Sequence, residues 1–562
     1  MTRVVATNIV SPLGETTDLN YEALLQGRSA LRRLSVDGVP VEVVASRLSD
    51  AQMQEISVEG FTRFESMVHF SVRKAMECGG IDPSDGRTLF VLGTTKADAD
   101  ELSHGSYCPP GEAAAKVARR LGITAAPLVV CNACISGVTA LLAAKRLIDS
   151  GAYDRAVVCG ADCLTAFALA GFTSFKALSP QECRPFDIDR LGLNLGEAAA
   201  TIILSNEPAE AADEECWYLE KGALDNDAYH ISAPSPDGEG VYRVIEQTME
   251  GVDMECLALV GAHGTATMFN DQMESRAIER AGMSQLPLSA LKGYFGHTLG
   301  ASGVLESIIL MRALDDGIIL PSRGYSERGV SGKVNISAQI RRSQKKSFIK
   351  VISGFGGCNG AILFSKGREA SESVEDRKWN ATALHSVRIT PDSLVIDGQN
   401  VQLPCSGREV LEHIYRTYIG DYPKFHKMDP LSKLVFAASS LLVSSEGDAR
   451  NDVMRSIVLF NSSSSIVADR QHIASFTGNE GFFPSPSVFV YTLPNISIGE
   501  AAIRFSCKGE TTMYIIPHRD DKTINEIQES TFRFSQVKTM ITGWVDCESE
   551  DEFEADMKIL SI

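Results

Sequence analysis

Cys134 lies where a side chain could act as a nucleophile. It follows a short apolar run, residues 128–131, and precedes a segment with helical periodicity, residues 137–148. We therefore expect a strand, a sharp turn and a helix, with the thiol at the amino end of that helix. The helix dipole and the unpaired amides there favour the thiolate. The same amides could form one side of an oxyanion hole.

Two other interpretations of this segment stay open from the residues alone. A lone cysteine in an apolar strand is most often a core residue. Cys131 and Cys134 also form a Cys-x-x-Cys pair, which is typical of dithiol redox chemistry. A zinc site is not favoured, because a second pair of ligands at the usual spacing is missing.

Two histidines stand in glycine-rich turns, each next to an apolar run or a predicted helix. His263 lies in Gly-Ala-His-Gly-Thr-Ala-Thr, and His297 lies in Gly-His-Thr-Leu-Gly-Ala-Ser-Gly. Such a placement indicates two groups that project into one cleft, although a lone histidine is more often structural. A further glycine-rich segment, 352–360, allows close backbone approach, and the N–H of Phe355 could donate to an oxyanion.

The elements that must position these residues belong to an α/β protein. Apolar runs alternate with helix-period segments through the first 366 residues, which predicts a mostly parallel sheet flanked by helices. Polar residues follow at 367–378, and a hairpin is expected around Pro391 and Asp392.

Composition narrows the class of protein. The 562 residues are 44% hydrophobic and 22% charged, which is ordinary globular composition, and they exceed one small domain. The net charge of −19 argues against a general nucleic-acid binder or a polybasic membrane-surface protein. Thirteen scattered cysteines are not a secreted disulfide framework, and no apolar run reaches 18 residues. The expected location is therefore the cytoplasm, with no membrane insertion.

Together these motifs resemble the β-ketoacyl-acyl carrier protein synthases of the elongating type, which use a cysteine and two histidines. The resemblance runs through residues 1–366 and includes Arg184-Pro-Phe-Asp187, Asp227-Ala-Tyr-His230 and the closing Gly-Phe-Gly-Gly-x-Asn-Gly. It implies a thiolase fold, in which two similar halves form an α-β-α-β-α stack. It also implies decarboxylative condensation of an acyl group on the cysteine with malonyl-acyl carrier protein, without a metal or cofactor.

The resemblance assigns a role to each matching residue. Cys134 would carry the acyl group, His263 and His297 would stabilise the enolate, and Lys292 would pair with Glu306. Substrate contacts would come from Thr265, Thr267, Gly354, Phe355 and Gly356, with Phe355 as the gate between the acyl and malonyl pockets. The amides of Cys134 and Phe355 would bind the tetrahedral oxyanion.

Three departures from the family pattern predict a reshaped pocket. Asn132 stands where the family usually has Thr, and Gly293-Tyr294-Phe295 replaces a small, hydroxyl-rich segment. The segment 196–200 lacks the glycines usual after Gly-Glu. These departures bear on the substrate range and not on the class of reaction.

The expected domain organisation has four parts. They are a first half with the nucleophile (1–206), a second half with the two histidines (207–366), a linker and hairpin (367–404) and a degenerate synthase-like half (405–562). The last part repeats patterns of the first half, but His518 stands at the counterpart of Cys134, so it is expected to be inactive. We expect it to form an internal pseudo-dimer with the first half, through contacts near residues 491–495; a homodimer is the other possibility.

The expected partner is acyl carrier protein, loaded with acyl or malonyl groups. Because that partner is acidic, basic clusters are the candidate docking sites, namely Arg119-Arg120 and Arg341-Arg342 with Lys345-Lys346. Fatty-acid, polyketide or polyene-type elongation is the leading function. A non-condensing partner that resembles a chain-length factor or primes the pathway, and a thiol-redox protein, are the alternatives.

Overall fold

The fold of the chain is described by a computed structural model. It describes residues 2–105, 107–207, 215–367, 379–447, 453–477 and 481–562. The predicted polar linker therefore lies outside the described residues, apart from Gly367.

The first sheet has five strands in the spatial order β5-β4-β6-β7-β1. β4 runs parallel to β5 and β6, whereas β7 is antiparallel to β6 and β1. Its strands are β1 (Thr2–Val10), β4 (Thr88–Gly93), β5 (Leu128–Val130), β6 (Arg155–Asp162) and β7 (Ala198–Ser205).

A second sheet repeats this plan. Its order is β10-β9-β14-β15-β8, with the same parallel and antiparallel pairings. Its strands are β8 (Trp217–Asn226), β9 (Leu257–Gly261), β10 (Pro287–Ser289), β14 (Ser347–Ser353) and β15 (Cys358–Lys366), with β12 (Asn335–Ile336) beside β10. The two short pairs outside the sheets are β2 (Arg32–Leu34) with β3 (Val43–Ala45), and β11 (Ile318–Ile319) with β13 (Arg341–Arg342).

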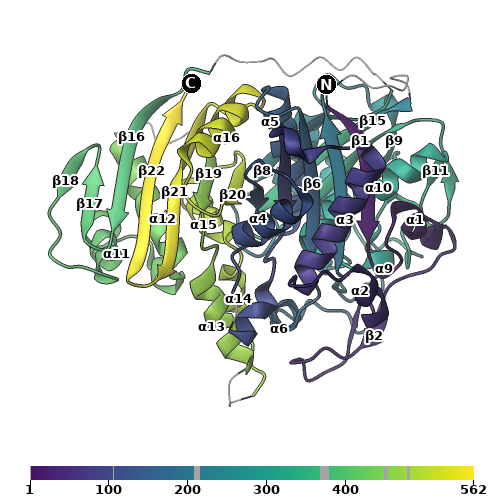
Figure 1. Cartoon of the computed structure of the whole chain (residues 1–562), viewed down its shortest axis with the longest axis horizontal. Coiled ribbons are helices and arrows are strands. Elements are labelled where there is room, and N and C mark those ends of the chain that lie inside the picture. Colours follow the sequence, from purple (N-terminus) through teal and green to yellow (C-terminus); the bar gives the residue numbers. More distant parts are fainter. Residues whose placement is uncertain (1, 106, 208–214, 368–378, 448–452, 478–480) are drawn as a thin grey trace.

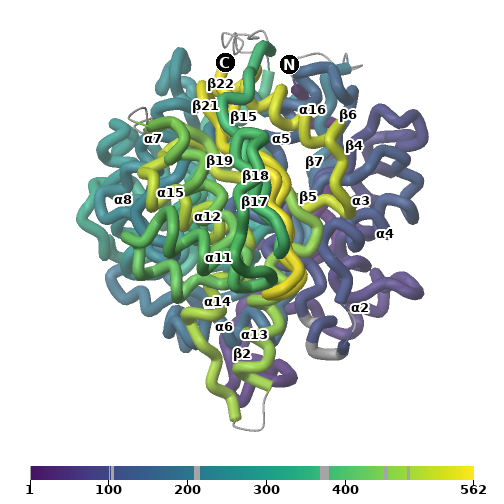
Figure 2. The backbone as a smooth tube through the Cα atoms, turned by 90° about the vertical axis from the view of Figure 1, so that its left-hand side faces the viewer, coloured from purple at the N-terminus to yellow at the C-terminus, as the bar shows by residue number. Residues whose placement is uncertain are grey.

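The C-terminal segment forms a third sheet with the same order and the same strand directions, β20-β19-β21-β22-β16. Its strands are β16 (Thr382–Thr390), β19 (Ser456–Asn461), β20 (Thr511–Ile515), β21 (Thr539–Ser549) and β22 (Glu552–Ser561). β17 (Ser393–Ile396) and β18 (Gln399–Val401) extend its outer edge, which faces the viewer in Figure 2. The hairpin predicted around Pro391 and Asp392 is confirmed, because Thr390 pairs with Ser393.

Helices form the remaining layers. α5 (Ser136–Asp149) and α10 (Ser302–Asp315) each contact strands of both the first and the second sheet, so they lie between them. α3 (Arg63–Gly79) covers the outer face of the first sheet and α7 (Glu239–Met249) covers the second. The predicted α-β-α-β-α stack is therefore confirmed for the first two sheets. No described helix combines the length and the apolar character needed to span a bilayer.

Local sequence signals explain where several of these helices begin and end. α3 starts with a capping box made by Thr62 and Glu65, and Gly80 ends it in the left-handed conformation. The other helices of the first two parts are α1 (Thr17–Leu25), α2 (Asp50–Ile56), α4 (Pro110–Leu121), α6 (Ala166–Ser174), α8 (Met268–Arg280) and α9 (Lys292–Phe295). Those of the C-terminal part are α11 (Glu409–Ile414), α12 (Pro430–Ser445), α13 (Ile466–Thr477), α14 (Pro486–Tyr491), α15 (Asn495–Phe505) and α16 (Asp521–Arg533).

The third sheet joins the first along one edge. β20 pairs antiparallel with β5, with Tyr514 opposite Val130, and the Cys131 amide donates to the Met513 carbonyl over 3.0 Å. In Figure 1 the C-terminal part, in green and yellow, lies beside the first half, with α16 near α5 and α14 near α6. β5, the strand that leads to Cys134, is thus an inner strand of one continuous sheet.

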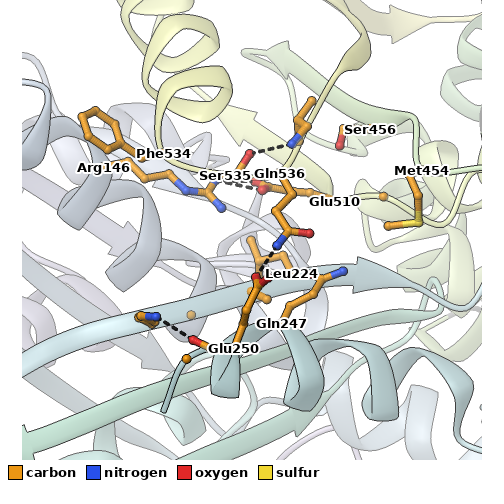
Figure 3. A pocket seen from close by; sticks show the side chains of 16 residues that line it. Arg146, Leu224, Gln247, Glu250, Met454, Ser456, Glu510, Phe534, Ser535 and Gln536 are labelled. Atoms are coloured by element: carbon orange, nitrogen blue, oxygen red, sulfur yellow. Dashed lines mark hydrogen bonds and ion pairs between the residues drawn. The ribbon is translucent and has the colours of Figure 1, made fainter. Parts of the chain in front are cut away.

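A buried ion pair strengthens this junction. Arg146 on α5 pairs with Glu510 ahead of β20 at 2.8 Å, and their side chains are 7% and 3% exposed. Both line a cavity of about 360 Å³ between the two parts, in which Gln536 also donates to Glu250 (Figure 3).

Replacing Glu510 by Gln should destabilise the junction by about 3–5 kcal/mol, because it leaves the Arg146 guanidinium buried without a counter-charge. The measurement is the midpoint of denaturant unfolding. Asp154→Ala is the control, since its pair with Arg87 is exposed and should contribute no more than about 1 kcal/mol. Equal midpoints for the two variants would show that the buried pair does not hold the parts together.

Candidate active site

Cys134 sits in a strained turn between β5 and α5. Ala133, just before it, has a φ of 49°, in the left-handed region that non-glycine residues rarely adopt. The Ser136 hydroxyl stabilises the turn, since it accepts from the Asn132 amide over 2.8 Å and donates to the Ala133 carbonyl over 2.6 Å. The strand, turn and helix predicted around Cys134 are therefore confirmed.

Two glycines let the amino ends of α5 and α10 meet. A Cβ on Gly137 would lie 2.6 Å from the Gly300 carbonyl oxygen, and a Cβ on Gly303 would lie 2.6 Å from a Val138 methyl carbon. No larger residue fits at this crossing. The close approach brings the turn that carries His297 next to Cys134, and the distance from His297 Nε2 to Cys134 Sγ is 3.1 Å.

The hydrogen bonds of His297 indicate which ring nitrogen carries the proton. The Leu299 amide donates to Nδ1 over 3.3 Å, so Nδ1 is an acceptor and the proton lies on Nε2. Nε2–H therefore points at the sulfur. Burial, together with the positive charges of Lys292 and Lys350, lowers the pKa of His297 well below its usual value, so the ring is neutral.

His263 comes from the turn after β9 and faces His297, with the two ring centres 5.2 Å apart and the rings nearly perpendicular. Glu274 on α8 accepts from the amides of His263 and Gly264 over 2.6 and 2.9 Å. Burial is the main cause that lowers the pKa of His263 well below its usual value, and Lys292, His297 and Lys350 add to it. The structure thus brings both predicted histidines and the cysteine together.

The predicted pair of Lys292 and Glu306 is present. Lys292 Nζ lies 2.8 Å from Glu306 Oε1 and also donates to the His263 carbonyl over 2.7 Å. Although burial raises the pKa of Glu306, the ammonium groups of Lys292 and Lys350 lower it below its usual value. Sequence reasoning missed Lys350; the only signal was a lysine inside the apolar run 347–352.

The ionisation of Cys134 differs from the expectation. Burial raises the pKa of the thiol to about 12, although Lys292 and the amides of Cys134 and Phe355 act to lower it. The helix that was expected to favour the thiolate begins at Ser136, after a turn of 3₁₀ helix. The resting group is therefore a thiol, because removal from water outweighs the nearby donors.

The cysteine opens onto a cleft of about 320 Å³. Thr265 and Thr267, hydrogen-bonded to each other over 2.9 Å, line it together with Gly354 and Phe355. Gly356 does not line it: its φ is 89°, and a Cβ there would lie 2.6 Å from Asn495 Nδ2. The glycine therefore gives room for the C-terminal part and not for substrate.

A second, apolar pocket of about 30 Å³ adjoins Cys134. Phe355 borders both this pocket and the cleft, at the place predicted for a gate. Phe489 and Leu493 line the pocket from the C-terminal part. Leu493 lies in the predicted interface segment 491–495, but sequence reasoning missed that either residue lines the pocket. No local pattern marks them, because they reach the site only through the docking of the third sheet.

Three of the divergent residues, Asn132, Tyr294 and Phe295, do not reshape the pocket by direct contact with it. Asn132 is fully buried and donates to the Thr511 carbonyl over 2.8 Å, so it binds the third sheet. Tyr294 and Phe295 are buried in the main core. None of the three lines the cleft or the apolar pocket.

The dithiol interpretation also loses support. Cys131 has no exposed surface, and burial raises its pKa far above the usual value. None of the thirteen cysteines, all of which the structure describes, forms a disulfide bond.

Neither predicted basic cluster borders the cleft. Lys346 donates to the Asp315 carbonyl at the carboxyl end of α10. That end lies about 20 Å along the helix axis from the amino end, which is the end next to His297. Arg119 and Arg120 lie in the last turn of α4. From there the chain enters β5 at its amino end, whereas Cys134 follows the carboxyl end of β5. Among the described residues that line the cleft, none is a lysine or an arginine.

Replacing His297 by Ala should slow alkylation of Cys134 by iodoacetamide. The variant loses the Nε2–H that stabilises the thiolate, so the pKa of Cys134 rises and the alkylation profile moves to higher pH by about one unit. Peptide mass mapping across a pH series measures this. His385→Ala, on β16, is the control, and a His297→Ala profile that coincides with it would contradict the assigned hydrogen bond.

Known proteins resemble this chain in sequence. The sequence matches the family model for Beta-ketoacyl synthase, N-terminal domain, over residues 3–209, and that for Beta-ketoacyl synthase, C-terminal domain, over residues 218–326. A 3-oxoacyl-[acyl-carrier-protein] synthase 2 from Rhizobium meliloti (strain 1021) is 29% identical over 419 residues, covering 65% of this chain and 99% of that protein. Nodulation protein E from Rhizobium leguminosarum bv. trifolii is 30% identical over 285 residues, covering 50% of this chain and 70% of that protein.

Solved structures also resemble this chain in fold. The ishigamide ketosynthase/chain length factor aligns with a TM-score of 0.60 at 24% identity, over 65% of this chain and 99% of that one. The PfaC Keto synthase-Chain length factor aligns over 100% of this chain and 78% of that one, with a TM-score of 0.80 at 14% identity. The fold is therefore the predicted thiolase fold, and the C-terminal part also has a structural counterpart. The cysteine, the paired histidines and the two matching family models together show that the chain belongs to the β-ketoacyl synthase family.

Proposed function

We propose that this chain catalyses decarboxylative condensation of an acyl group, held on Cys134, with malonyl-acyl carrier protein. The observation that carries the proposal is the arrangement of Cys134 with two neutral histidines: one lies 3.1 Å from the sulfur, and the second lies beside the first. A soft nucleophile and two N–H donors are the groups that this reaction requires.

The first step is transfer of the acyl group. The Cys134 sulfur attacks the thioester carbonyl of the acyl carrier, the bond to the carrier thiol breaks, and the thiol proton passes to that leaving group. His297 Nε2–H stabilises negative charge on the sulfur during the attack. The amides of Cys134 and Phe355 both face the sulfur, and they provide the donors for the tetrahedral oxyanion.

In the second step malonyl thioester enters the cleft. Its carboxylate leaves as CO₂, and the electron pair forms an enolate whose oxygen accepts hydrogen bonds from His263 and His297. The enolate carbon then attacks the acyl carbonyl on Cys134, which forms the new C–C bond, breaks the C–S bond and releases Cys134 as a thiolate that takes a proton from water. Thr265 and Thr267, at the cleft wall, are placed to bind the pantetheine arm.

Acyl carrier protein is the proposed partner, in line with the names of the relatives. We place its docking at the mouth of the cleft, where α8 begins with Met268 and Phe269, which are 57% and 78% exposed. Phe269 also lines the cleft, so a carrier bound there can deliver its arm to Cys134. The two basic clusters, which do not border the cleft, are less suited to this task.

The third sheet is proposed to be an inactive synthase-like half that completes the site as an internal pseudo-dimer. At the counterpart of the nucleophile the chain has His518, which is exposed and follows Pro517. From this part Asn495 donates to the Phe355 carbonyl over 2.8 Å, and Asp469 pairs with the buried Lys96 beside the apolar pocket. These contacts lie in and beside the predicted interface at residues 491–495.

A priming role is the second candidate function. The apolar pocket beside Cys134 has only about 30 Å³, room for little more than one or two waters. In this form the enzyme could decarboxylate malonyl groups and hold only very short acyl groups, unless Phe489 and Leu493 move aside.

Replacing Cys134 by Ala should abolish both acyl loading and product formation, because the variant lacks the thiol that is proposed to carry the acyl group. Intact-mass analysis after incubation with a panel of acyl carriers measures loading. Cys131→Ala is the matched control and should load normally. Loading that persists in Cys134→Ala, or that is lost in Cys131→Ala, would contradict the proposal.

Replacing Leu493 by Ala should let Cys134 accept longer acyl chains, because the variant widens the apolar pocket from the C-terminal side. The measurement is the distribution of acyl masses on Cys134. Leu411→Ala, on α11, is similarly buried and should share a loss of stability of about 2–5 kcal/mol without the change in chain length. If the two variants give the same acyl distribution, the third sheet does not shape the acyl pocket.

A further inference from the structure

Lys350 is a buried cation in an unusual position. It lies in the middle of β14, between Ile349 and Val351, and its side chain has no exposed surface. A fully buried lysine is rare and costly unless its charge is matched. Gly261 makes room for it, since a Cβ there would lie 3.2 Å from Lys350 Cδ.

The ammonium of Lys350 has a complete set of partners. Nζ lies 2.8 Å from Glu306 Oε2 and donates to the carbonyls of Ala262 and Val351, each over 2.9 Å. The other oxygen of Glu306 is 2.8 Å from Lys292 Nζ. One carboxylate is thus shared by two lysines, and the three groups carry one positive charge in excess.

These charges hold the backbone on both sides of His263. Lys350 binds the carbonyl of residue 262, Lys292 binds that of residue 263, and Glu274 accepts from the amides of residues 263 and 264. The turn that presents the His263 ring is therefore fixed by charged hydrogen bonds on both its carbonyl and its amide side.

Titratable groups from several elements surround the histidines. They are Lys292 on α9, Glu306 on α10, Glu274 and Asp271 on α8, Lys350 on β14, Asp162 on β6, and the Cys134 thiol. Burial raises the pKa of Glu274 to about 7, so its charge is partial near neutral pH. Burial and the neighbouring charge of Lys292 lower the pKa of Lys350, and the ion pair with Glu306 opposes that change.

We propose that Lys350 is a positioning residue of the condensation site: its ammonium fixes the turn that carries His263 and adds a positive charge that, together with burial and Lys292, disfavours protonation of both histidines. This proposal rests on the proposed function, in which each ring donates Nε2–H to the enolate. A protonated histidine can still donate, but it would hold the malonyl carboxylate as an ion pair and oppose loss of CO₂.

Loss of the Lys350 charge should shift the pH profile of the rate in one direction. In the wild type two lysines disfavour the charged imidazolium, so activity should persist well below the usual histidine pKa. Removing one positive charge raises the pKa of both histidines, and the acid limb of the rate profile then moves to higher pH. A role confined to packing would lower the rate or the stability without moving that limb.

The test measures malonyl-carrier decarboxylation against pH for Lys350→Met. The acid limb should move up by about one unit, so that the rate at a pH below the new limb falls about tenfold. Lys350→Arg retains the charge and should keep the limb in place. Lys366→Met, which breaks a surface pair with Asp315, is the control. An unmoved limb in a folded Lys350→Met enzyme would overturn the proposal.

A second measurement uses the wild-type protein, so it depends neither on the folding of a Lys350 variant nor on enzymatic activity. NMR titration of histidine-labelled wild-type protein should show two buried imidazoles, absent from His263→Ala and His297→Ala, that stay neutral down to about pH 5. Titration of either ring near its ordinary pKa would overturn the proposal. Wild-type protein with neutral histidines but no decarboxylation would count against the proposed function alone.

Discussion

The crossing of α5 and α10 is the constraint on which the site depends. Gly137 and Gly303 let the two helices touch backbone to backbone, which sets the turns at their amino ends side by side. One turn carries Cys134 and the other carries His297, so the 3.1 Å contact between sulfur and Nε2 follows from the packing of the halves. Because each helix lies between the first two sheets, a change in the stacking of the sheets would separate the reacting groups.

The third sheet contacts two of the segments that form this site. It pairs with the strand that leads to Cys134, and Asn495 holds the carbonyl of Phe355, whose amide faces the sulfur. Both amides proposed to bind the oxyanion therefore lie on segments contacted by the C-terminal part. The C-terminal part therefore contacts both the strand that leads to Cys134 and the segment that carries Phe355.

The residues proposed to react are easier to predict from the sequence than the residues that pack around them. Cys134, His263, His297 and Lys292 stand in short turns with distinct residue patterns, and the strand, turn and helix around Cys134 follow from local periodicity. The roles of Lys350, Phe489 and Leu493 at the site are not evident from their local sequence, because their proximity to the site arises from strands and helices far apart in the chain. The protonated state of Cys134 was missed for a related reason: burial is a tertiary property, and here it outweighs the helix dipole.

The central claim is that this site forms a carbon–carbon bond. The most direct measurement is mass analysis of the carrier-bound product after the enzyme meets an acyl carrier and a malonyl carrier. The account predicts a β-ketoacyl carrier that contains the acyl group plus the two carbons left after CO₂ is lost. Acylated Cys134 together with only acetyl carrier, and no β-keto product, would contradict it and favour the priming role.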